Sequence, residues 1–496
     1  MNDINSKRAD VILFNPAPRR GYQPHRRVEL PLNLLFSSTP LVHSGYSVRI
    51  IDQFADPKWK EKLFDALREK PLCFGVSCMT GPQIIRALQV SQRVKDRYPD
   101  VPVIWGGIHP SLLPGQTLEN PLVDIVVIGE GEATLLELVK ALEGDSSLDQ
   151  VSGIAYPQNG HLRFTEPRPF VDLNKQPPLA YHLVDMDLYR RRIFGSDHVS
   201  FNSSRGCVHQ CAFCYDSIVH KRKWRAMAPE TVVENLKRVI RDYDIHGFNF
   251  TDDNLFVNMN HAYQVMEEIA RADLNIRIGK LHIRVDTINK MDKDFLDLLV
   301  RAGIERLTIG VESGNQRILD LIKKDLTPEQ VLEASRKLID HPIVPVYLFM
   351  MGLPTETPDE LRQSIQLARQ LLNENPRASK SFNIYTPYPG TELYSLVVRS
   401  GLQEPRRLED WAPLNYRYVH EESPWISKEM KRLIGALDLP LMLMGKGHFY
   451  KKTNPMVVAL SRLYQPLAHY RITHLDGRFP VETKLLRGLG LFGRND

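Results

Sequence analysis

The sequence predicts an α/β protein built from a doubly wound N-terminal domain, a partial (β/α)6 barrel and a small, mainly helical C-terminal region. Two series of short apolar runs alternate with longer amphipathic segments, a pattern typical of parallel sheets covered by helices on both faces. A proline-rich stretch separates the two series, and after Gly401 the pattern changes to aromatic and basic residues. The 496 residues are also too many for one ordinary core.

The first series fits a doubly wound domain over residues 8–145. Between its apolar runs, the segment 82–98 places Ile84, Leu88 and Val94 at helical spacing. Domains of this kind bind ligands across the carboxyl ends of their strands, so a ligand is expected at the loops that follow the strands. The apolar runs of this domain span residues 11–14, 47–51, 73–77, 101–105 and 125–128.

A linker is expected over residues 146–194 and the partial barrel over residues 195–400. The linker is rich in proline and carries no sustained period. All but the last of the six apolar runs that follow precede a helical pattern, and one helix opens at Pro358 with two acidic residues in its first turn. Six units suit a partial barrel, whose chemistry is expected at the carboxyl ends of the strands. The runs span residues 198–203, 248–251, 281–285, 306–311, 344–350 and 381–385.

The bulk composition is that of a folded protein and gives little support to nucleic-acid binding. The chain is 43% apolar and 25% charged, and its formal net charge of +5 is small for this length. No stretch reaches the roughly 18 to 20 apolar residues of a membrane span, and the first residues lack the apolar core of a secretory signal. A cytoplasmic protein is therefore expected. Five cysteines, three of them within eight residues, indicate a metal site rather than a disulfide framework.

The three clustered cysteines, Cys207, Cys211 and Cys214, follow the first strand of the expected barrel. Spacings of three and two intervening residues let one loop wrap three thiolates around a cubane iron–sulfur cluster and leave one iron open. Gly206 permits the close backbone approach that such wrapping needs.

Zinc binding and buried structural thiols are the alternatives for these cysteines. A structural zinc needs a fourth ligand, for which His209 and His220 are available in the same stretch. The position of the loop directly after a barrel strand favours the iron–sulfur cluster.

The motif Cys-x3-Cys-x-aromatic-Cys, with Phe213 as the aromatic residue, resembles the hallmark of the radical S-adenosylmethionine (SAM) enzymes. This resemblance covers about residues 195–400. It implies a [4Fe–4S] cluster whose fourth iron is chelated by the amino and carboxylate groups of SAM, with Phe213 beside the cofactor. The reduced cluster then cleaves SAM to methionine and a 5′-deoxyadenosyl radical, which abstracts hydrogen. A reducing partner such as flavodoxin or ferredoxin is implied as well.

Polar residues at the next strand ends are expected to bind SAM. Asp252 and Asp253 follow the second strand, where the family places acceptors for the amino group of SAM, although a solvated turn also explains them. Arg284 ends the third strand and is suited to pair the carboxylate of SAM through its planar guanidinium group. Glu312 and Ser313 follow the fourth strand, at the family's ribose-contacting position. A charge that closes an apolar run is costly without a partner, which favours a functional role.

Two tyrosines after the sixth strand, Tyr385 and Tyr388, are expected to line the substrate pocket. They stand in the segment Tyr-Thr-Pro-Tyr-Pro-Gly-Thr, in which turn chemistry alone explains Pro389 and Gly390 equally well.

The N-terminal domain resembles the cobalamin-binding module of the B12-dependent radical enzymes over about residues 8–190. The loops after four of its strands read Asn-Pro-Ala-Pro, Ser-Cys-Met-Thr-Gly, Gly-Gly-Ile-His-Pro and Gly-Glu-Gly-Glu, and their glycines let a large ligand lie against backbone. No glycine-rich phosphate fingerprint of the dinucleotide or P-loop type is present. The resemblance implies that cobalamin contacts Ser77, Thr80, Gly106, Gly107, His109, Gly129 and Gly131.

The Asp-x-His-x-x-Gly motif, which supplies a histidine ligand to cobalt in other B12 proteins, is absent here. The corresponding loop reads Asn15-Pro-Ala-Pro-Arg-Arg-Gly21. Many radical members resemble this pattern and hold the corrin without a histidine ligand. His109 is a candidate cobalt ligand, weighed against a loop residue that bonds its neighbours. Cys73 and Cys78 flank a buried strand and are expected to act as small hydrophobes.

The region over residues 401–496 interleaves basic and apolar residues and is expected to form a helix near 455–470. Such a segment suits a helical cap over the barrel mouth. It also suits peripheral contact with the inner, anionic face of a membrane, and both interpretations stay open.

Together these resemblances imply a cobalamin-dependent radical SAM methyltransferase that acts on an unactivated carbon. One SAM would methylate cob(I)alamin, a second would give the radical, and the substrate radical would take the methyl group from methylcobalamin. A B12-dependent oxidative cyclase or ring-rearranging enzyme is the second hypothesis, and a non-catalytic corrinoid or metal carrier is the third. The substrate is expected to be a small or lipid-like molecule, which no short motif identifies.

Overall fold

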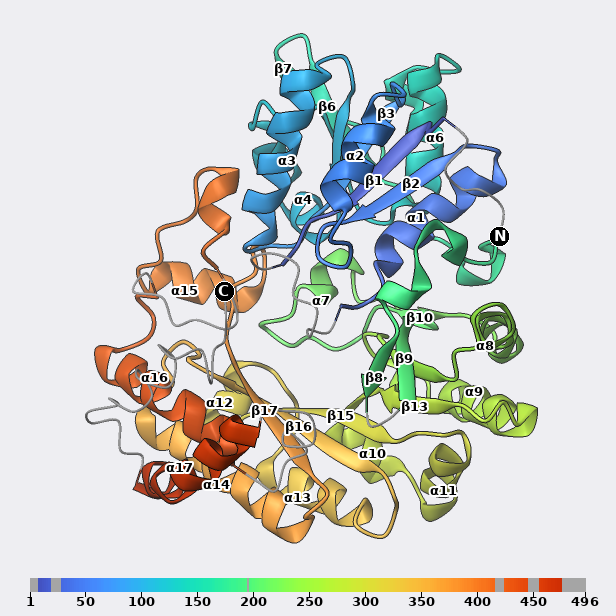
Figure 1. The fold of residues 1–496 in the computed structure, drawn as a ribbon. Helices are drawn as coiled ribbons and strands as arrows, with labels where there is room; N and C mark the ends of the chain where they lie inside the picture. Colours follow the sequence, from blue (N-terminus) through green and yellow to red (C-terminus); the bar gives the residue numbers. More distant parts are fainter. Residues whose placement is uncertain (1–7, 19–27, 194–195, 415–422, 445–454, 475–496) are drawn as a thin grey trace.

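The structure is a computed structural model that describes residues 8–18, 28–193, 196–414, 423–444 and 455–474 (Figure 1). Its two main parts are a seven-stranded sheet built from the N-terminal third of the chain and a partial barrel that follows it. Two C-terminal helices pack on the outside of the barrel. The predicted α/β architecture is therefore confirmed.

The first sheet has a parallel core of five strands in the order β2-β1-β3-β4-β5. Alternate residues of a strand face opposite sides, so Val11 and Leu13 join the core beneath α1 and α6, whereas Ile12 and Phe14 join the core beneath α2 and α3. The strands are β1 (Val11–Asn15), β2 (Val48–Asp52), β3 (Cys73–Ser77), β4 (Val103–Gly106) and β5 (Ile125–Val127). The helices are α1 (Leu32–His43), α2 (Trp59–Leu67), α3 (Gln83–Arg97), α4 (Ile108–Leu112), α5 (Pro114–Leu118) and α6 (Gly131–Glu143).

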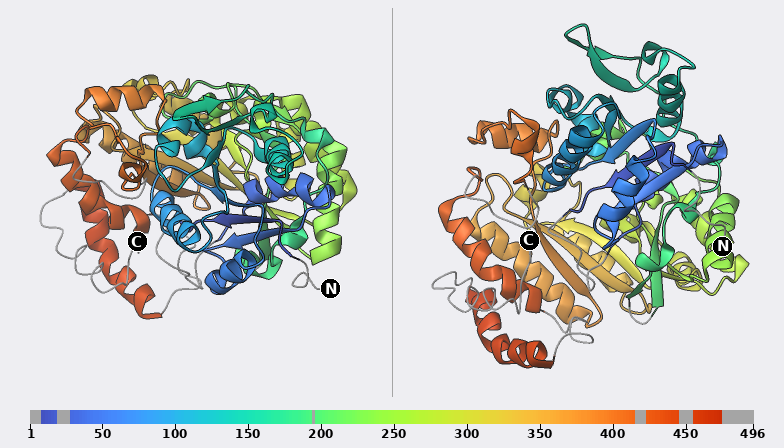
Figure 2. Two further views of the ribbon diagram at one scale, coloured as in Figure 1. Left: turned by 90° about the horizontal axis from the view of Figure 1, so that it is seen from above. Right: turned by 45° about the horizontal axis from the view of Figure 1, so that its top comes forward.

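Part of the segment expected to be a linker extends this sheet. The hairpin of β6 (Ile154–Gln158) and β7 (His161–Phe164) adds two antiparallel strands beyond β5, and Figure 2 shows it projecting from the body of the protein. Only the first three residues of β6 are buried, and all four of β7 are exposed. So short an apolar run does not stand out among the neighbouring prolines, which is why the sequence did not reveal it.

The barrel consists of six parallel strands, as the six apolar runs predict, if β13 and β14 are counted as one interrupted strand. They are β9 (Ser196–Phe201), β12 (Gly247–Phe250), β13 (Arg277–Lys280) with β14 (His282–Arg284), β15 (Arg306–Glu312), β16 (Val344–Met351) and β17 (Ser379–Ile384). The third strand is divided at Leu281, which splits the barrel into two four-stranded sheets. An antiparallel strand, β8 (Arg191–Ile193), closes the edge beside β9.

Helices follow the strands, and most of them lie on the outer side of the barrel, whereas α7 (Asp216–Val219) lies between the barrel and the first sheet and contacts α4 (Figure 1). The Pro358 helix predicted from its acidic first turn begins with a capping box, in which Thr357 and Glu360 satisfy each other's backbone N–H groups. The helices are α7 (Asp216–Val219), α8 (Pro229–Tyr243), α9 (Met259–Ala272), α10 (Val285–Lys290), α11 (Lys293–Arg301), α12 (Gln316–Leu321), α13 (Pro328–Lys337), α14 (Pro358–Glu374) and α15 (Glu392–Arg399).

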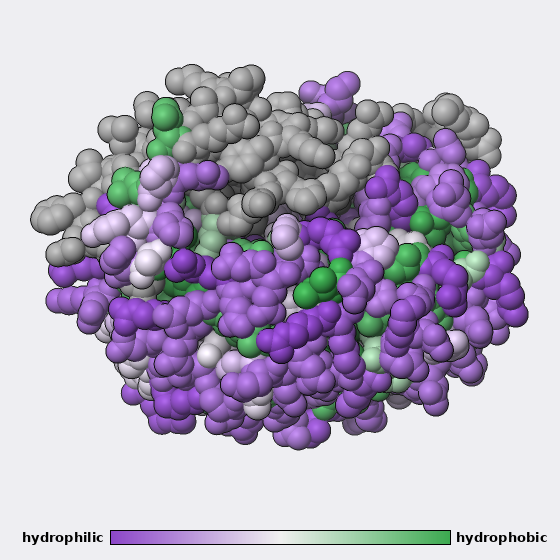
Figure 3. Space-filling view, turned by 90° about the horizontal axis from the view of Figure 1, so that it is seen from below, coloured by the Kyte–Doolittle hydropathy of each residue, from purple (hydrophilic) through white to green (hydrophobic). Residues whose placement is uncertain are grey.

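The C-terminal helices α16 (Lys428–Leu443) and α17 (Pro455–His474) pack on each other, and α16 contacts α14. Trp425 donates its indole N–H to the Gly352 carbonyl at 3.0 Å, which ties the start of α16 to the end of β16. These helices thus lie along the outside of the barrel, whereas the N-terminal sheet covers its mouth (Figures 1 and 2). None of the described helices combines the length and apolarity needed to cross a membrane. The underside is mostly hydrophilic where it is described (Figure 3).

The loop after β16 holds a buried carboxyl group whose ionisation should affect stability. Glu356 Oε2 accepts the N–H groups of Gly352 at 2.7 Å and Leu353 at 3.3 Å. Burial nevertheless raises the pKa of Glu356 from 4.5 to about 8. Because the folded protein holds this proton more tightly than the unfolded chain, the stabilisation is complete below pH 4.5 and is lost as pH rises through 8.

We therefore expect Glu356→Gln, which mimics the protonated group, to flatten the pH dependence of the unfolding free energy between pH 4.5 and 8. Urea denaturation at a series of pH values measures this dependence. Equal slopes in the variant and the wild type would show that Glu356 contributes nothing to it.

Candidate functional site

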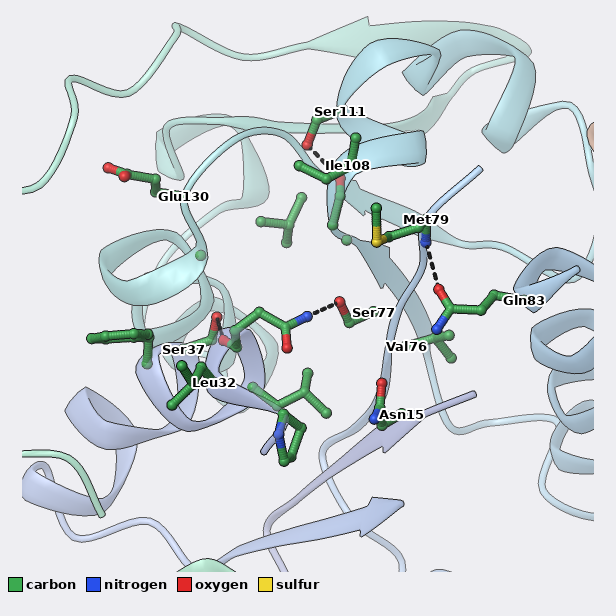
Figure 4. Close-up of a pocket in the computed structure, with 18 of the residues that line it drawn as sticks. Asn15, Leu32, Ser37, Val76, Ser77, Met79, Gln83, Ile108, Ser111 and Glu130 are labelled. Carbon is green, nitrogen blue, oxygen red and sulfur yellow. Dashed lines mark hydrogen bonds between the residues drawn. The ribbon is translucent and has the colours of Figure 1, made fainter. Parts of the chain in front are cut away.

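A cavity of about 1120 Å³ lies where the carboxyl ends of the first sheet face the barrel (Figure 4). Residues from the loops after β1, β3, β4 and β5 and from α1 line one side. Barrel residues line the other: Asn202, Arg205, Val219, His220, Thr251, Asp253, Thr386 and Tyr388. Its volume exceeds the upper end of ordinary small-molecule pockets, about 1000 Å³, so it suits a ligand of corrin size.

Six of the seven residues predicted to bind cobalamin line this cavity, namely Ser77, Thr80, Gly106, Gly107, Gly129 and Gly131. Gly107 has φ +95°, and a Cβ there would lie 2.8 Å from the Cys78 carbonyl oxygen, so the loop after β4 cannot carry a side chain at this point. Asn33 donates to the Ser77 hydroxyl, and Gln83 accepts the Met79 N–H at 3.0 Å (Figure 4). A broad cradle of backbone and small polar groups fits a large, flat cofactor.

His109, the seventh of these residues, lies behind the cavity wall. Its side chain is fully buried, its Nδ1 is 3.0 Å from the Thr80 hydroxyl, and its ring packs edge-on against Trp411. Burial lowers the pKa of His109 to about 4, so the ring is neutral at pH 7. The structure thus places His109 where it supports Thr80, and gives no direct path from its ring to a ligand in the cavity.

The cysteine loop connects the short strand β10 (Ser204–Arg205) to α7. Asp253 accepts the Gly206 N–H at 2.8 Å, and the Ala212 N–H reaches the Ile322 carbonyl at 2.9 Å. Gly206 has φ +84°, and a Cβ there would collide with the Lys223 carbonyl oxygen. The loop is therefore held at both ends, and the glycine before Cys207 is required by the close passage of two backbone segments.

The three thiols lie too far apart in this structure to share a single zinc ion. Two thiolates on one tetrahedral zinc stand about 3.8 Å apart, because each Zn–S bond is about 2.3 Å long. Within the described part of the chain, the Sγ atoms of Cys207, Cys211 and Cys214 do not all come within 4.8 Å of one another. Burial raises the pKa of Cys214 to about 12, so ionisation of this thiol requires a cationic centre.

Three residues predicted to bind SAM meet beside this loop. Arg284 Nη1 lies 3.8 Å from Cys211 Sγ, and its Nη2 donates to the Lys324 carbonyl at 2.8 Å. Glu312 forms a buried ion pair with Lys324 at 2.8 Å, and the Lys324 ammonium lies 6.0 Å from the centre of the Phe213 ring. Lys324 had no sequence signal, because it stands in a run of charged residues that resembles an exposed turn.

Two other residues expected to bind SAM, Asp252 and Ser313, are buried and have hydrogen-bond partners within the protein. Asp252 is 1% exposed, and its Oδ1 accepts the N–H and hydroxyl of Ser203 and the hydroxyl of Ser204, at 3.1, 2.7 and 2.6 Å. Ser313 is fully buried, with its hydroxyl 3.1 Å from that of Ser364. The contacts of Asp252 with Ser203 and Ser204 support the segment that leads into the cysteine loop. Asp253, in contrast, faces the cavity.

The two tyrosines predicted to line the substrate pocket are separated in the structure. Tyr388 lines the cavity, and its ring centre is 4.9 Å from that of Tyr215. Tyr385 is 2% exposed and packs edge-on against Trp425, away from the cavity lining.

Asp216, His220 and Asp253 form a polar group on the barrel side of the cavity. His220 Nε2 is 3.5 Å from Asp216 Oδ1 and 3.9 Å from Asp253 Oδ2. Burial, together with the nearby charge of Asp253, raises the pKa of Asp216 to about 8. Of the three, the sequence suggested His220 only as a zinc ligand and Asp253 only as a partner of SAM. Together they give this wall of the cavity groups that are able to exchange protons.

Comparison with known proteins agrees with both halves of the site. A family model described as the radical SAM superfamily matches residues 201–368, and one described as a B12 binding domain matches residues 29–139. An uncharacterized methyltransferase of Pyrococcus horikoshii is 30% identical over 81% of this chain and 86% of its own length. The anaerobic magnesium-protoporphyrin IX monomethyl ester cyclase of Synechocystis is 29% identical over 83% of this chain and 80% of its own.

A solved structure shares the fold over nearly the whole chain. The cobalamin-dependent SAM radical enzyme OxsB, with aqua-cobalamin and SAM bound, superposes with a TM-score of 0.71 at 19% identity. The match covers 97% of this chain and 75% of OxsB.

Proposed function

Since the chain belongs to the radical SAM superfamily and carries a B12-binding domain, we propose that it is a methyltransferase that methylates an unactivated carbon of a small or lipid-like molecule. The chain is a B12-dependent radical SAM enzyme, and its cofactors are a [4Fe–4S] cluster, SAM and cobalamin. The reaction and the substrate are the proposal.

The observation that carries the proposal is the single cavity shared by the two cofactor-binding halves. Its upper wall consists of the strand-end loops that fit cobalamin, and its lower wall includes Arg205 and Asp253, which flank the cysteine loop. A methyl donor and a radical source would then face one shared space, as methylation of an unactivated carbon requires.

Different residues of the chain would bind the different cofactors. Cys207, Cys211 and Cys214 would hold the cluster, and the glycine cradle after β4 and β5 would hold cobalamin. When bound, the cluster and SAM supply a hydrogen-abstracting radical, and cobalamin supplies a transferable methyl group. Arg284 and the Glu312–Lys324 pair offer fixed charges beside the cluster for the polar groups of SAM, since charge-assisted hydrogen bonds orient such groups strongly.

An oxidative cyclase or ring-rearranging activity is the second candidate. The similarity to the Synechocystis cyclase, at 29% identity over most of both chains, favours it. The third hypothesis, a non-catalytic carrier, is not retained, because the chain is a radical SAM enzyme with its three cysteines intact.

Product analysis distinguishes methylation from cyclisation. We expect anaerobic protein, reconstituted with cluster and cobalamin and supplied with deuteriomethyl-SAM, reductant and the small-molecule fraction of a cell extract, to form 5′-deoxyadenosine and S-adenosylhomocysteine together. A product in which one hydrogen is replaced by a deuteriomethyl group completes the assignment. Formation of 5′-deoxyadenosine and of an unmethylated, cyclised or rearranged product without S-adenosylhomocysteine would instead identify the cyclase-type reaction.

A reducing protein such as flavodoxin or ferredoxin belongs to the proposal as the electron donor. Peripheral contact with a membrane stays a prediction, for which α17 supplies three exposed apolar side chains, Leu463, Leu467 and Tyr470.

A further inference from the structure

A buried network of four charged residues joins the two halves of the protein. Glu130, in the loop after β5, accepts Arg225 Nη1 at 2.9 Å on both carboxylate oxygens and Arg205 Nη1 at 3.0 Å. Glu132, in the first turn of α6, accepts Arg205 Nη2 at 2.6 Å. We call Glu130, Glu132, Arg205 and Arg225 the interdomain network.

The network is shielded from water and held on its flanks. The Glu130 side chain is 9% exposed, and that of Glu132 is 3% exposed. The Arg205 guanidinium stacks over Phe36 at 4.3 Å, and that of Arg225 over Phe170 at 4.4 Å. Burial disfavours the ionised form of Glu130, but the two arginines and a backbone N–H outweigh it, so its pKa lies below the ordinary value.

Each end of the network belongs to one cofactor site. Arg205 and Arg225 are paired residues of the hairpin formed by β10 and β11 (Arg225–Ala226), and Arg205 precedes Gly206 and Cys207 directly. Glu130 and Glu132 alternate with Gly129 and Gly131 in the loop that lines the cavity. Arg205, Glu130 and Glu132 themselves line the cavity as well.

The backbone of Val171, in the segment that connects the first sheet to the barrel, takes part in the interdomain network. The Val171 N–H donates to Glu130 Oε2 at 2.9 Å, and its carbonyl accepts Arg225 Nη1 at 3.2 Å. His220 Nδ1 is 3.2 Å from Arg225 Nη2, which extends the contacts to the polar group beside Cys214.

We propose that the interdomain network couples the two cofactor sites, so that binding of cobalamin and binding of SAM change each other's affinity through Glu130. A ligand in the cavity contacts the loop that carries Glu130, and that loop is fixed to the residue before the cysteine loop. Separating these largely buried charges would leave them unpaired, which is unfavourable, so the loop and the hairpin should shift together. Such a coupling is reciprocal by thermodynamic necessity. The proposal needs both cofactors to bind but does not depend on methyl transfer.

Binding measurements on anaerobic protein with a reconstituted cluster test the coupling without turnover. The dissociation constant of hydroxocobalamin is measured from its visible absorbance, with and without saturating SAM, and that of SAM with and without hydroxocobalamin. For the wild type we expect both constants to change by the same factor, on the order of fivefold or more. In Glu130→Gln we expect this factor to fall to about one, while each cofactor still binds alone.

Glu137→Gln is the matched control, because Glu137 lies on α6, the helix that directly follows Glu130, and pairs with Arg168, which is not part of the network. It should keep the wild-type factor. A second readout is the electron paramagnetic resonance spectrum of the reduced cluster, which should respond to hydroxocobalamin in the wild type but not in Glu130→Gln.

Arg225→Lys keeps the charge but not the planar group, and it provides the test should Glu130→Gln fail to fold. We expect its coupling factor to be reduced as well. A wild-type factor of one would overturn the proposal, and so would a wild-type factor retained in Glu130→Gln or, in its place, Arg225→Lys.

Discussion

Alanine at any one of Cys207, Cys211 or Cys214 is expected to abolish both the iron–sulfur absorbance and the cleavage of SAM to 5′-deoxyadenosine. With these three protein ligands the cluster would already have one open iron, available to SAM. Removing a thiolate exposes a second iron, and the remaining two ligands no longer enclose the cubane. Iron and sulfide content, the visible spectrum and 5′-deoxyadenosine formation under reductant measure the result.

Cys73→Ala provides the matched control for these variants. Cys73 is fully buried in β3, in the other half of the protein, where it packs as a small hydrophobe. Its loss leaves a small cavity that costs on the order of 1 kcal/mol but leaves the cluster in place. If an alanine variant of Cys207, Cys211 or Cys214 kept the same iron content as Cys73→Ala, the ligand assignment would be refuted.

Asp252→Ala is expected to lower the free energy of unfolding by about 3 kcal/mol or more, because it removes the acceptor of three buried hydrogen-bond donors. Ser203 and Ser204, which stand three and two residues before Gly206, would lose their hydrogen-bond partner. We therefore expect cluster content to fall together with stability. Urea denaturation and iron analysis of the same preparation measure both effects.

The neighbouring residue makes this prediction specific. Asp253 faces the cavity and accepts one backbone N–H, that of Gly206, while its other neighbours are the side chains of Asp216 and His220. We expect Asp253→Ala to cost only about 1 kcal/mol of stability and to act mainly on cofactor binding. Equal losses of stability in the two variants would show that Asp252 is not the brace that its contacts indicate.

The order of helices and strands was predictable because it rests on strong local patterns. Apolar runs such as Val344 to Met350 form strands almost where the pattern places them, and Pro358 opens a helix with a complete capping box. The glycines of the cavity were predictable too, because the carboxyl ends of parallel strands meet at one edge of a sheet. These features depend on residues close together in the sequence.

The direction in which a side chain points was harder to predict. His109 lies in α4 just after β4, and Ser313 and Tyr385 directly follow β15 and β17, yet the side chain of each is buried in the protein interior. Near Glu312 the register between β15 and β16 shifts, and this residue has φ +70°, which turns it toward Lys324. A shift of one residue reverses the face that a side chain occupies, and nothing in the sequence marks this one.

The interdomain network was not predictable at all. Glu130 meets Arg205 and Arg225, which lie 75 and 95 residues further along the chain. Their contact depends on how two sheets are placed relative to each other, whereas local spacing reveals only pairs on one helix or strand. Read singly, each of the three looks like an ordinary exposed charge.

Val171 is bonded through both of its backbone polar groups: its N–H donates to a carboxylate of one half, and its carbonyl accepts from a guanidinium group of the other. Bonds from both halves at this residue tie the connection to each of them, so we expect the two halves to stay together during turnover. Substrate and product are then expected to pass through the rim of the cavity by movement of loops or side chains.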